Sequence, residues 1–334
     1  MNIQLSGNGT GIVVPKKTFS LFLIVGFISL FTSCKKETVA TPASESASML
    51  SADEAVAKST TNFGALISGN TNIDDEIKIL NKLGVKYVRY AIVLKDFNGV
   101  DKGYEKWVNA GFKVLLNLNW DGVLGETGKT PVAFPTNMVK YRAKLEQVLD
   151  KYQPEVAVIE NEECTDQFHS GPIENYITEL QTAVDVCNQR GIAVADGGIH
   201  VDYVEVVMSG IKLDGNALET KKLIDAFKTM NLTYVNTHAK GPFDKFGRQN
   251  VYPAGTLEDD ADYIRTQTGK PVMCNEYNQQ NSSTALMTGA VGGFKNGKFK
   301  YVIARSGSSG NDGTPLNNGT SLTALGIAYR DAIQ

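Results

Sequence analysis

Carboxylate and amide side chains follow two short apolar runs that lie far apart in the sequence. Asn161 and Glu162 come directly after the run 156–160, and Glu276 comes directly after the run 272–275. Two facing carboxyl groups can cleave a glycosidic bond, because one protonates the leaving oxygen while the other, ionised, attacks the anomeric carbon or activates water. Neither step needs a cofactor. We therefore take Glu162 and Glu276 as candidate catalytic residues.

Polar and aromatic side chains at the ends of other apolar runs could surround these carboxylates. Arg89 lies within the run 87–93, and a cation there would help to keep one carboxylate ionised. His238 ends the run 234–238 and could contact a ligand, and aromatic rings beyond the strand ends could stack on a sugar. The candidate substrate-binding residues are Asn161, Arg89, His238, Trp120, Tyr277 and Asn119.

Each of these residues also has a purely structural interpretation. A glutamate at a strand end is by itself usually a solvated loop carboxylate, and Trp120 and Tyr277 could pack at the rim of the fold. Glu160 should share a strand face with Glu162. It would then be either a core carboxylate with a basic partner or a neighbour that raises the pKa of Glu162.

The elements that must position these residues repeat one plan from residue 62 onward, a β-branched run followed by a longer segment of helical periodicity. This alternation predicts βα units on a parallel sheet. The expected strands are 63–67, 87–93, 113–118, 156–160, 193–196, 234–238, 272–275 and 301–304. The expected helices are 74–83, 103–110, 138–152, 173–190, 217–230, 257–268, 284–294 and 322–333.

Eight such units over residues 60–334 predict a single (β/α)₈ TIM barrel, the α/β fold whose functional residues gather at the carboxyl ends of the strands. Glycines at several helix ends, among them Gly84 and Gly269, fit left-handed caps. An open doubly wound sheet is the alternative. It is disfavoured because no Gly-x-Gly-x-x-Gly motif follows the first strand.

The first 59 residues have a different composition from the rest. Lys16 and Lys17 precede an apolar run over 19–31, which is too short to span a bilayer and is typical of a signal peptide. Cys34 then follows a string that resembles a bacterial lipobox, so we expect a signal peptide over 1–33 and lipidation at Cys34. Ordinary secretion is the alternative. Residues 34–59 are rich in small polar residues and predict a flexible tether.

Charge and motif content make several classes of protein poor candidates. The formal net charge is −3, which gives no sign of a nucleic-acid partner. The three histidines do not form a metal-binding motif, so no metal is expected. Lys240 lies beside Gly241 and Pro242, outside the apolar setting that a Schiff-base lysine needs. We expect buried thiols at the remaining cysteines, and we assume a monomer.

The residues resemble clan A glycoside hydrolases, retaining enzymes with a (β/α)₈ barrel. Asn161 and Glu162 match the Asn-Glu pair that ends strand four of that clan, and Glu276 matches the glutamate that ends strand seven. The resemblance implies that Glu162 is the general acid/base, Asn161 binds the sugar 2-hydroxyl and Glu276 is the nucleophile. It also implies that Arg89 orients the nucleophile and that His238 stands beside it.

Together these patterns predict a retaining glycoside hydrolase acting on β-linked glycans, anchored by lipid in the bacterial cell envelope. Two departures from the clan pattern support an alternative. Glu163 replaces the proline common after the acid, and the run 301–305 lacks the usual terminal tryptophan. The alternative is a non-catalytic glycan-binding lipoprotein on a degenerate glycosidase barrel.

Overall fold

A computed structural model describes residues 60–67, 72–122, 131–241, 256–307 and 313–334 of the chain. The predicted signal peptide, the tether and Cys34 lie outside these residues. Part of the Ser- and Gly-rich segment 305–319 lies outside them as well.

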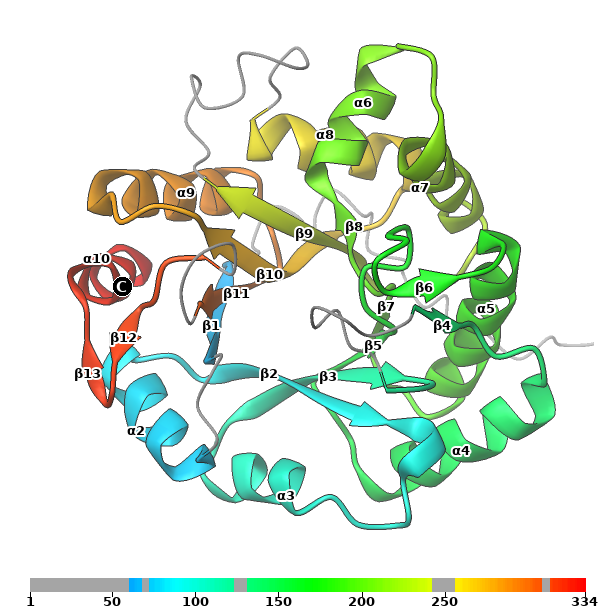
Figure 1. Ribbon diagram of the computed structural model, residues 1–334, viewed down its shortest axis with the longest axis horizontal. Coiled ribbons are helices and arrows are strands. Elements are labelled where there is room, and N and C mark those ends of the chain that lie inside the picture. Colours follow the sequence, from blue (N-terminus) through cyan, green and yellow to red (C-terminus); the bar gives the residue numbers. More distant parts are fainter. Residues whose placement is uncertain (1–59, 68–71, 123–130, 242–255, 308–312) are drawn as a thin grey trace, which may run out of the picture. The chain divides into compact units, whose positions relative to one another are not determined.

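Nine short parallel strands form one curled sheet in the order β7-β5-β3-β2-β1-β11-β10-β9-β8 (Figure 1). Most of their residues are buried, on both faces of the sheet, as in parallel strands generally. Their bounds are Asn62–Ile67 (β1), Tyr87–Val93 (β2), Lys113–Asn119 (β3), Val156–Ile159 (β5), Val194–Ala195 (β7), Ile199–His200 (β8), Val235–Gly241 (β9), Val272–Gln279 (β10) and Tyr301–Ser306 (β11).

The sheet closes into a barrel, because its two ends, β7 and β8, are consecutive pieces of one chain segment. Ala195 of β7 forms a parallel bridge to Tyr234, just before β9. The peptide N–H groups of Thr233 and Tyr234 both donate to the carbonyl oxygen of Val194, at 3.0 and 3.2 Å. β7 and β8 together occupy the fifth of eight strand positions around the barrel. The predicted (β/α)₈ barrel is therefore confirmed.

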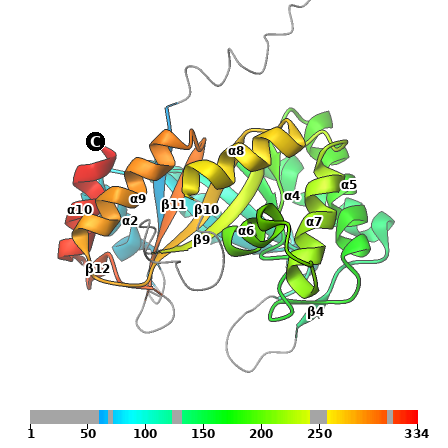
Figure 2. The same cartoon turned by 90° about the horizontal axis from the view of Figure 1, so that it is seen from above.

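Helices surround this barrel (Figures 1 and 2). Their bounds are Ile73–Leu83 (α2), Lys102–Asn109 (α3), Met138–Lys151 (α4), Ile173–Gln189 (α5), Val201–Ser209 (α6), Gly215–Phe227 (α7), Leu257–Thr268 (α8), Thr284–Asn296 (α9) and Ala324–Ile333 (α10). Eight match the predicted segments within a few residues, and α6 was not predicted. Gly84 and Gly269 adopt the expected left-handed cap conformation. None of the helices in the described residues is long and apolar enough to cross a membrane.

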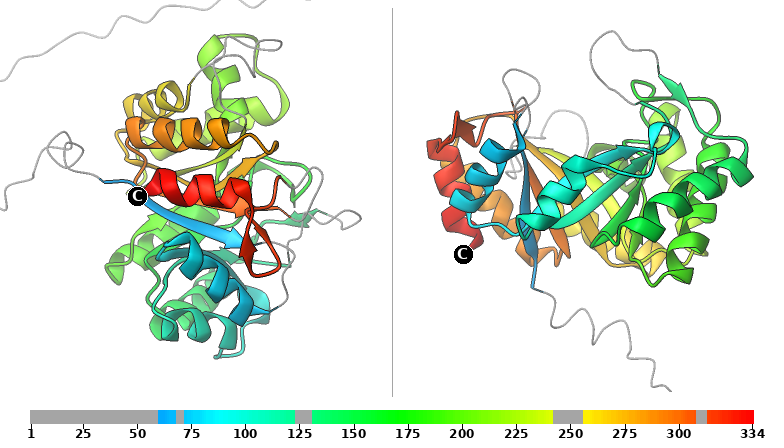
Figure 3. Two further views of the ribbon diagram at one scale, coloured as in Figure 1. Left: turned by 90° about the vertical axis from the view of Figure 1, so that its left-hand side faces the viewer. Right: turned by 90° about the horizontal axis from the view of Figure 1, so that it is seen from below.

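Several short elements lie outside the barrel strands and the helices. A 3₁₀ turn, Leu94–Asp96, follows β2, and the two-residue strands β4 (Val132–Ala133) and β6 (His169–Ser170) pair in parallel. The two-residue strands β12 (Asn317–Asn318) and β13 (Ser321–Leu322) pair antiparallel before α10. Figure 3 shows α10 beside α2 and α9, on the flank of the barrel formed by β1.

The barrel interior changes from apolar to polar along strands such as β3 and β11. Leu115, Val158 and Ile303 belong to an inner apolar cluster, separate from the larger core between strands and helices. Two residues further along their strands, on the same face, lie Asn117 after Leu115 and Arg305 after Ile303. The polar layer therefore sits at the carboxyl ends of the strands. The cysteines of the described residues are free and buried, as expected.

Gly64 marks a close contact between β1 and β2. A Cβ atom built at Gly64 would lie 2.3 Å from the carbonyl oxygen of Tyr87, a backbone atom that cannot turn aside. We therefore predict that Gly64→Ala lowers the free energy of unfolding by about 1–3 kcal/mol or more, measured by urea denaturation. Gly292→Ala in α9, where a Cβ would meet nothing within 4 Å, is the matched control. Equal stability of the two variants would contradict the predicted clash.

Candidate active site

The guanidinium group of Arg89 joins four strands of the barrel mouth. Arg89 Nε donates to Asn117 Oδ1 at 3.0 Å, which links β2 to β3. Its Nη1 donates to Glu276 Oε2 of β10, and its Nη2 donates to Asn161 Oδ1, just after β5. The side chain of Arg89 is 9% exposed. A buried cation of this kind fixes the relative positions of Asn161 and Glu276.

Glu276 is held as a carboxylate by two cations and an amide. Besides Arg89, Arg305 Nη1 lies 3.1 Å from Glu276 Oε1, and Asn278 Nδ2 donates to the same oxygen at 2.8 Å. Burial alone would raise the pKa of Glu276, but Arg89, His238 and Arg305 outweigh burial and lower the pKa to about 2. Glu276 is therefore ionised at any physiological pH.

A register shift in β10 turns two consecutive residues into the barrel. The pairing of β10 with β9 slips between Cys274 and Glu276, as in a β-bulge. Asn275 donates from Nδ2 to Asn117 Oδ1 at 3.1 Å, while Glu276 contacts Arg89, so both face the mouth. Tyr277 then points to the opposite side, towards the helices.

The turn after β5 carries Asn161 and Glu162 in an unusual backbone conformation. Glu160 and Glu162 have φ values of 66° and 49°, a region that costs residues other than glycine about 1–3 kcal/mol each. Tyr176 of α5 supports this turn, because its hydroxyl donates to Ile159 O at 3.0 Å and accepts from Gly197 N at 2.9 Å. The surrounding structure thus holds a strained turn at the barrel mouth.

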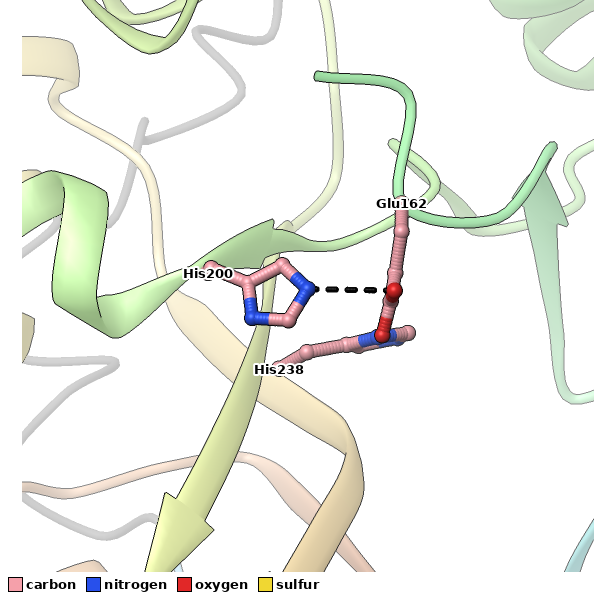
Figure 4. A group of neighbouring side chains, drawn as sticks. All are labelled: Glu162, His200 and His238. Carbon is pink, nitrogen blue, oxygen red and sulfur yellow. Dashed lines mark hydrogen bonds and ion pairs between the residues drawn. The ribbon is translucent and has the colours of Figure 1, made fainter. Parts of the chain in front are cut away.

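The carboxylate of Glu162 lies between two imidazole rings (Figure 4). His238 Nδ1 is 2.8 Å from Glu162 Oε1, and His200 Nε2 is 3.1 Å from Oε2. Burial would raise the pKa of Glu162, but the hydrogen bonds from His200 and His238 lower it well below its usual range. The two histidines therefore control the protonation of Glu162.

A chain of amide side chains determines which ring nitrogen of His238 carries a proton. The peptide N–H of Asn275 donates to Asn236 Oδ1 at 3.0 Å, so Asn236 Nδ2 must be the donor to Asn275 Oδ1 at 2.8 Å. His238 Nε2 lies 2.7 Å from the same Asn275 oxygen and must also donate. The 2.8 Å contact between His238 Nδ1 and Glu162 Oε1 then holds one proton, on either atom.

Glu162, His200 and His238 are also the only group of three in the described residues whose donor atoms lie close enough, within 4.8 Å, to hold a metal ion. Their contacts have the geometry of hydrogen bonds, since each ring takes a different carboxylate oxygen. In this structure the two rings are therefore hydrogen-bonding partners of Glu162.

The two aromatic residues predicted to contact a sugar, Trp120 and Tyr277, lie in different surroundings. Trp120 is half-buried beyond β3, packs edge-on against Tyr141 and lies under Lys140 Nζ. The prediction that Tyr277 contacts a sugar is wrong in this structure. Tyr277 is 1% exposed, packs against Phe294 of α9 and donates to Gln279 Oε1 at 2.6 Å. Its ring has no face open to a ligand.

Asn119 and Glu160 occupy buried positions near the site. Asn119 is buried at the end of β3, and its Oδ1 atom has no hydrogen-bond partner among the described residues. The expectation that Glu160 has a basic partner is wrong. The nearest candidate, His169 Nε2, is 4.0 Å away and is bonded to Asn161 O, and burial lowers the pKa of His169 to about 4. The alternative, that Glu160 raises the pKa of Glu162, is also wrong, because the pKa of Glu162 is lowered.

Sequence reasoning missed three residues that contact the two glutamates. His200 lies beyond the expected strand 193–196, yet it belongs to β8 and reaches Glu162. Arg305 follows the expected eighth strand, where only the absence of a tryptophan was noted, and Asn278 lies two residues after Glu276. Strand alternation could have identified Asn278, because residues two apart share a face.

Comparisons with known proteins find similarity in the fold alone. Neither protein-family models nor curated proteins match the sequence. A family 5 xyloglucanase from Paenibacillus pabuli superposes with a TM-score of 0.51 at 17% identity, over 83% of this chain and 98% of that one. A GH128 (subgroup II) endo-beta-1,3-glucanase from Sorangium cellulosum superposes with a TM-score of 0.54 at 13% identity, over 81% and 98%.

A third structure, Cel5A of Thermotoga maritima in complex with mannotriose, gives a TM-score of 0.52 at 14% identity, over 82% of this chain and 97% of that one. These proteins are glycoside hydrolases of families 5 and 128 in clan A. The expected likeness to clan A barrels is therefore confirmed at the level of the fold. The similarity spans nearly the whole length of each solved chain.

The ion pair of Arg89 and Glu276 gives a prediction for acid stability. Glu276 has a pKa lowered to about 2, so its stabilising contribution is complete above the unfolded pKa, near 4.3, and is lost as the pH falls through about 2. We predict that Arg89→Met lowers the free energy of unfolding at neutral pH by about 3 kcal/mol, measured by urea denaturation, and reduces its dependence on pH below about 4.

The exposed pair of Lys78 and Asp75 provides a control, because its side chains are 61% and 36% exposed. Lys78→Met should leave the free energy of unfolding nearly unchanged, because water screens an exposed ion pair. An Arg89→Met protein as stable as the parent at neutral pH would show that the buried pair is not what stabilises the mouth.

Proposed function

We propose that the protein is a glycoside hydrolase that cleaves β-linked glycans with retention of anomeric configuration. The observation that carries this proposal is the environment of Glu276, a buried carboxylate kept ionised by Arg89 at the carboxyl end of a barrel strand. An ionised carboxylate at this position can attack an anomeric carbon. The fold shared with clan A glycoside hydrolases supports the same assignment.

In this mechanism Glu162 is the general acid/base. It first protonates the leaving oxygen and then removes a proton from the attacking water. His238 Nδ1 and Glu162 Oε1 lie 2.8 Å apart and hold one proton between them, so Glu162 acts as the acid when that proton is on Oε1 and as the base when it is on Nδ1. His200 Nε2 stabilises the carboxylate form from the other side.

Asn161 binds the sugar beside the nucleophile in the proposed complex. Its Oδ1 accepts from Arg89, so its amide nitrogen is left to donate to a sugar hydroxyl next to the anomeric carbon. Trp120 and Asn119, at the end of β3, are further proposed contacts. The substrate class, a β-linked glucan or related polysaccharide, is suggested by neighbours described as a xyloglucanase and an endo-beta-1,3-glucanase.

Glycan binding without turnover is a second candidate function, and Arg305 favours it. Arg305 extends from the end of β11, where clan A enzymes usually carry a tryptophan, and contacts Glu276 Oε1 at 3.1 Å. A second cation stabilises the carboxylate further and makes it a weaker nucleophile. A protein that binds oligosaccharide equally well with Glu276→Gln, and never hydrolyses it, would have this second function.

The two glutamates should respond differently to substrates with different leaving groups. We predict that Glu276→Gln loses activity on all substrates, because no glycosyl-enzyme can form. Glu162→Gln should lose about 10²–10⁴-fold on polysaccharide and far less on a dinitrophenyl β-glycoside, whose leaving group needs no proton. Initial rates on both substrates, after circular dichroism has shown that the variants fold, test this prediction.

Glu174→Gln is the control for both variants, because Glu174 is an exposed carboxylate of α5 with 60% of its side chain accessible. It should hydrolyse both substrates at the parental rate. Undiminished polysaccharide hydrolysis by Glu162→Gln or Glu276→Gln would refute the assigned roles.

We also propose that Cys34 carries a lipid that holds the protein in the bacterial cell envelope, on the periplasmic or cell-surface face. The sequence before Cys34 and the polar segment 35–59 support this proposal. Cys34→Ala should abolish incorporation of labelled palmitate into the protein. Incorporation that survives this substitution would contradict the lipid anchor.

A further inference from the structure

Four carboxyl groups that the proposed reaction does not use lie buried behind the turn that carries Glu162. Glu160 and Glu163 flank the turn, Glu179 comes from α5, and Asp196 follows β7. None is more than 2% exposed. No lysine or arginine of the described residues pairs with any of them. Four ionised carboxylates in such a place would be prohibitively unstable, so some of them must be protonated.

The hydrogen bonds of Glu160 and Glu179 show which of the two holds a proton. Glu160 Oε1 accepts the peptide N–H of Trp120 at 2.6 Å, which favours the ionised form of Glu160 over that of Glu179. Neither carboxyl oxygen of Glu179 accepts a hydrogen bond from an N–H or O–H group of the described residues, and its carboxyl group lies beside that of Glu160. Two carboxyl groups in contact need a proton between them. That proton belongs to Glu179, which donates to Glu160.

Glu163 and Asp196 repeat this arrangement on the other side of the turn. Asp196 accepts two peptide N–H groups, from Asn236 at 2.7 Å and from Gly198 at 3.3 Å. The carboxyl group of Glu163 lies beside that of Asp196, and it packs so closely on Gly197 that a Cβ there would lie 2.6 Å from Glu163 Oε2. Asp196 is therefore the acceptor, and Glu163 is the protonated donor.

We propose that Glu179 and Glu163 are protonated positioning residues, which hold the strained turn from Glu160 to Glu163 by donating O–H hydrogen bonds to Glu160 and Asp196. One bond attaches the start of the turn to α5, and the other attaches its end to the segment between β7 and β8. Asn161 and Glu162 lie between the two attachments. Their role in catalysis rests on the proposed function, whereas the protonation of Glu163 and Glu179 does not.

This arrangement makes the turn sensitive to alkaline pH. Burial, and then the neighbouring carboxylate, raise the pKa values of Glu179 and Glu163 well above the usual range. A group whose folded pKa is raised contributes its stability fully below the unfolded pKa and loses it as the pH rises through the folded pKa. Loss of either proton places two negative charges in contact and releases one end of the turn.

Other ionisable groups face the two pairs but do not supply a cation. Burial raises the pKa values of Tyr141 and Tyr176 well above their usual range, and it lowers that of His169 to about 4, so these groups stay neutral where the pairs titrate. The remaining ionisable neighbours are Asp121, Cys187, Glu162, Cys164 and Glu219. These neighbours are acids and thiols, and a negative charge on any of them would raise the pKa values of Glu163 and Glu179 further.

Infrared difference spectroscopy tests the protonation directly and needs no substrate. The parent at neutral pH should show the C=O stretch of protonated carboxyl groups. Glu163→Gln and Glu179→Gln should each remove part of this band, and the exposed Glu174→Gln in α5 should not. Absence of the band in the folded parent at neutral pH would overturn the proposal, whatever the activity of the protein.

Thermal melts and pH–rate profiles test the positioning role. Glutamine keeps an N–H donor but has no proton to lose. In both glutamine variants the pH at which the melting temperature has fallen halfway, on the alkaline side, should therefore rise by about one unit or more. The alkaline limb of kcat/KM should shift with it, whereas the leucine variants at both positions should lose activity at every pH.

Unchanged alkaline limits in both glutamine variants would overturn the proposal. If a glutamine variant fails to fold, the companion variant and the parental infrared band still decide the outcome. If the band and the shifted melts are found in a protein that hydrolyses no glycan, the proton-sharing pairs stand and the proposed hydrolase function fails.

Discussion

The buried positive charge of Arg89 is the constraint on which the rest of the site depends. A guanidinium group this far from solvent is stable only if its donors are satisfied and its charge is balanced. Glu276 balances the charge, and Asn117 and Asn161 complete the hydrogen bonds. These three partners come from β3, β10 and the turn after β5, so one side chain fixes four strand ends relative to one another.

The same mouth gives neighbouring carboxyl groups different protonation states. Glu276, beside two arginines, stays ionised. Glu162, between two imidazole rings, shares a proton with His238. Glu163 and Glu179, which have neighbouring carboxyl groups and no lysine or arginine partner in the described part of the chain, keep their protons. The barrel thus assigns different chemistry to each glutamate through its neighbours, which is how acid and base functions can coexist in one site.

Much of the fold followed from local sequence patterns, because βα units have local signatures. The eight strand positions and eight of the helices were predicted from periodicity and from capping residues such as Gly84 and Gly269. The helix α6 was missed, because Val201–Ser209 follows the two-residue strand β8 with no loop between them. Arg89, Asn161, Glu162 and Glu276 were selected as candidates because each lies in or directly after a recognisable strand, and the structure brings Arg89, Asn161 and Glu276 into contact.

The remaining features depend on contacts between distant segments or on a local irregularity. The partner of Glu160 is Glu179, from a helix that sequence spacing does not connect to it. His200 reaches Glu162 only because the fifth barrel strand is split into β7 and β8. Tyr277 was misplaced because the register shift before Glu276 sets which residues of β10 face inwards, and a register shift leaves no mark in the sequence.

The central claim, that Glu276 is the nucleophile, is tested most directly by covalent trapping. A 2-deoxy-2-fluoro β-glycoside with a good leaving group slows the second step of a retaining reaction and accumulates the glycosyl-enzyme. After digestion of the trapped protein, peptide mass spectrometry locates the sugar. The account predicts one sugar per protein, attached to the Glu276 side chain. Attachment to another residue, or turnover of the parent substrate with inversion and no trapped adduct, would contradict it.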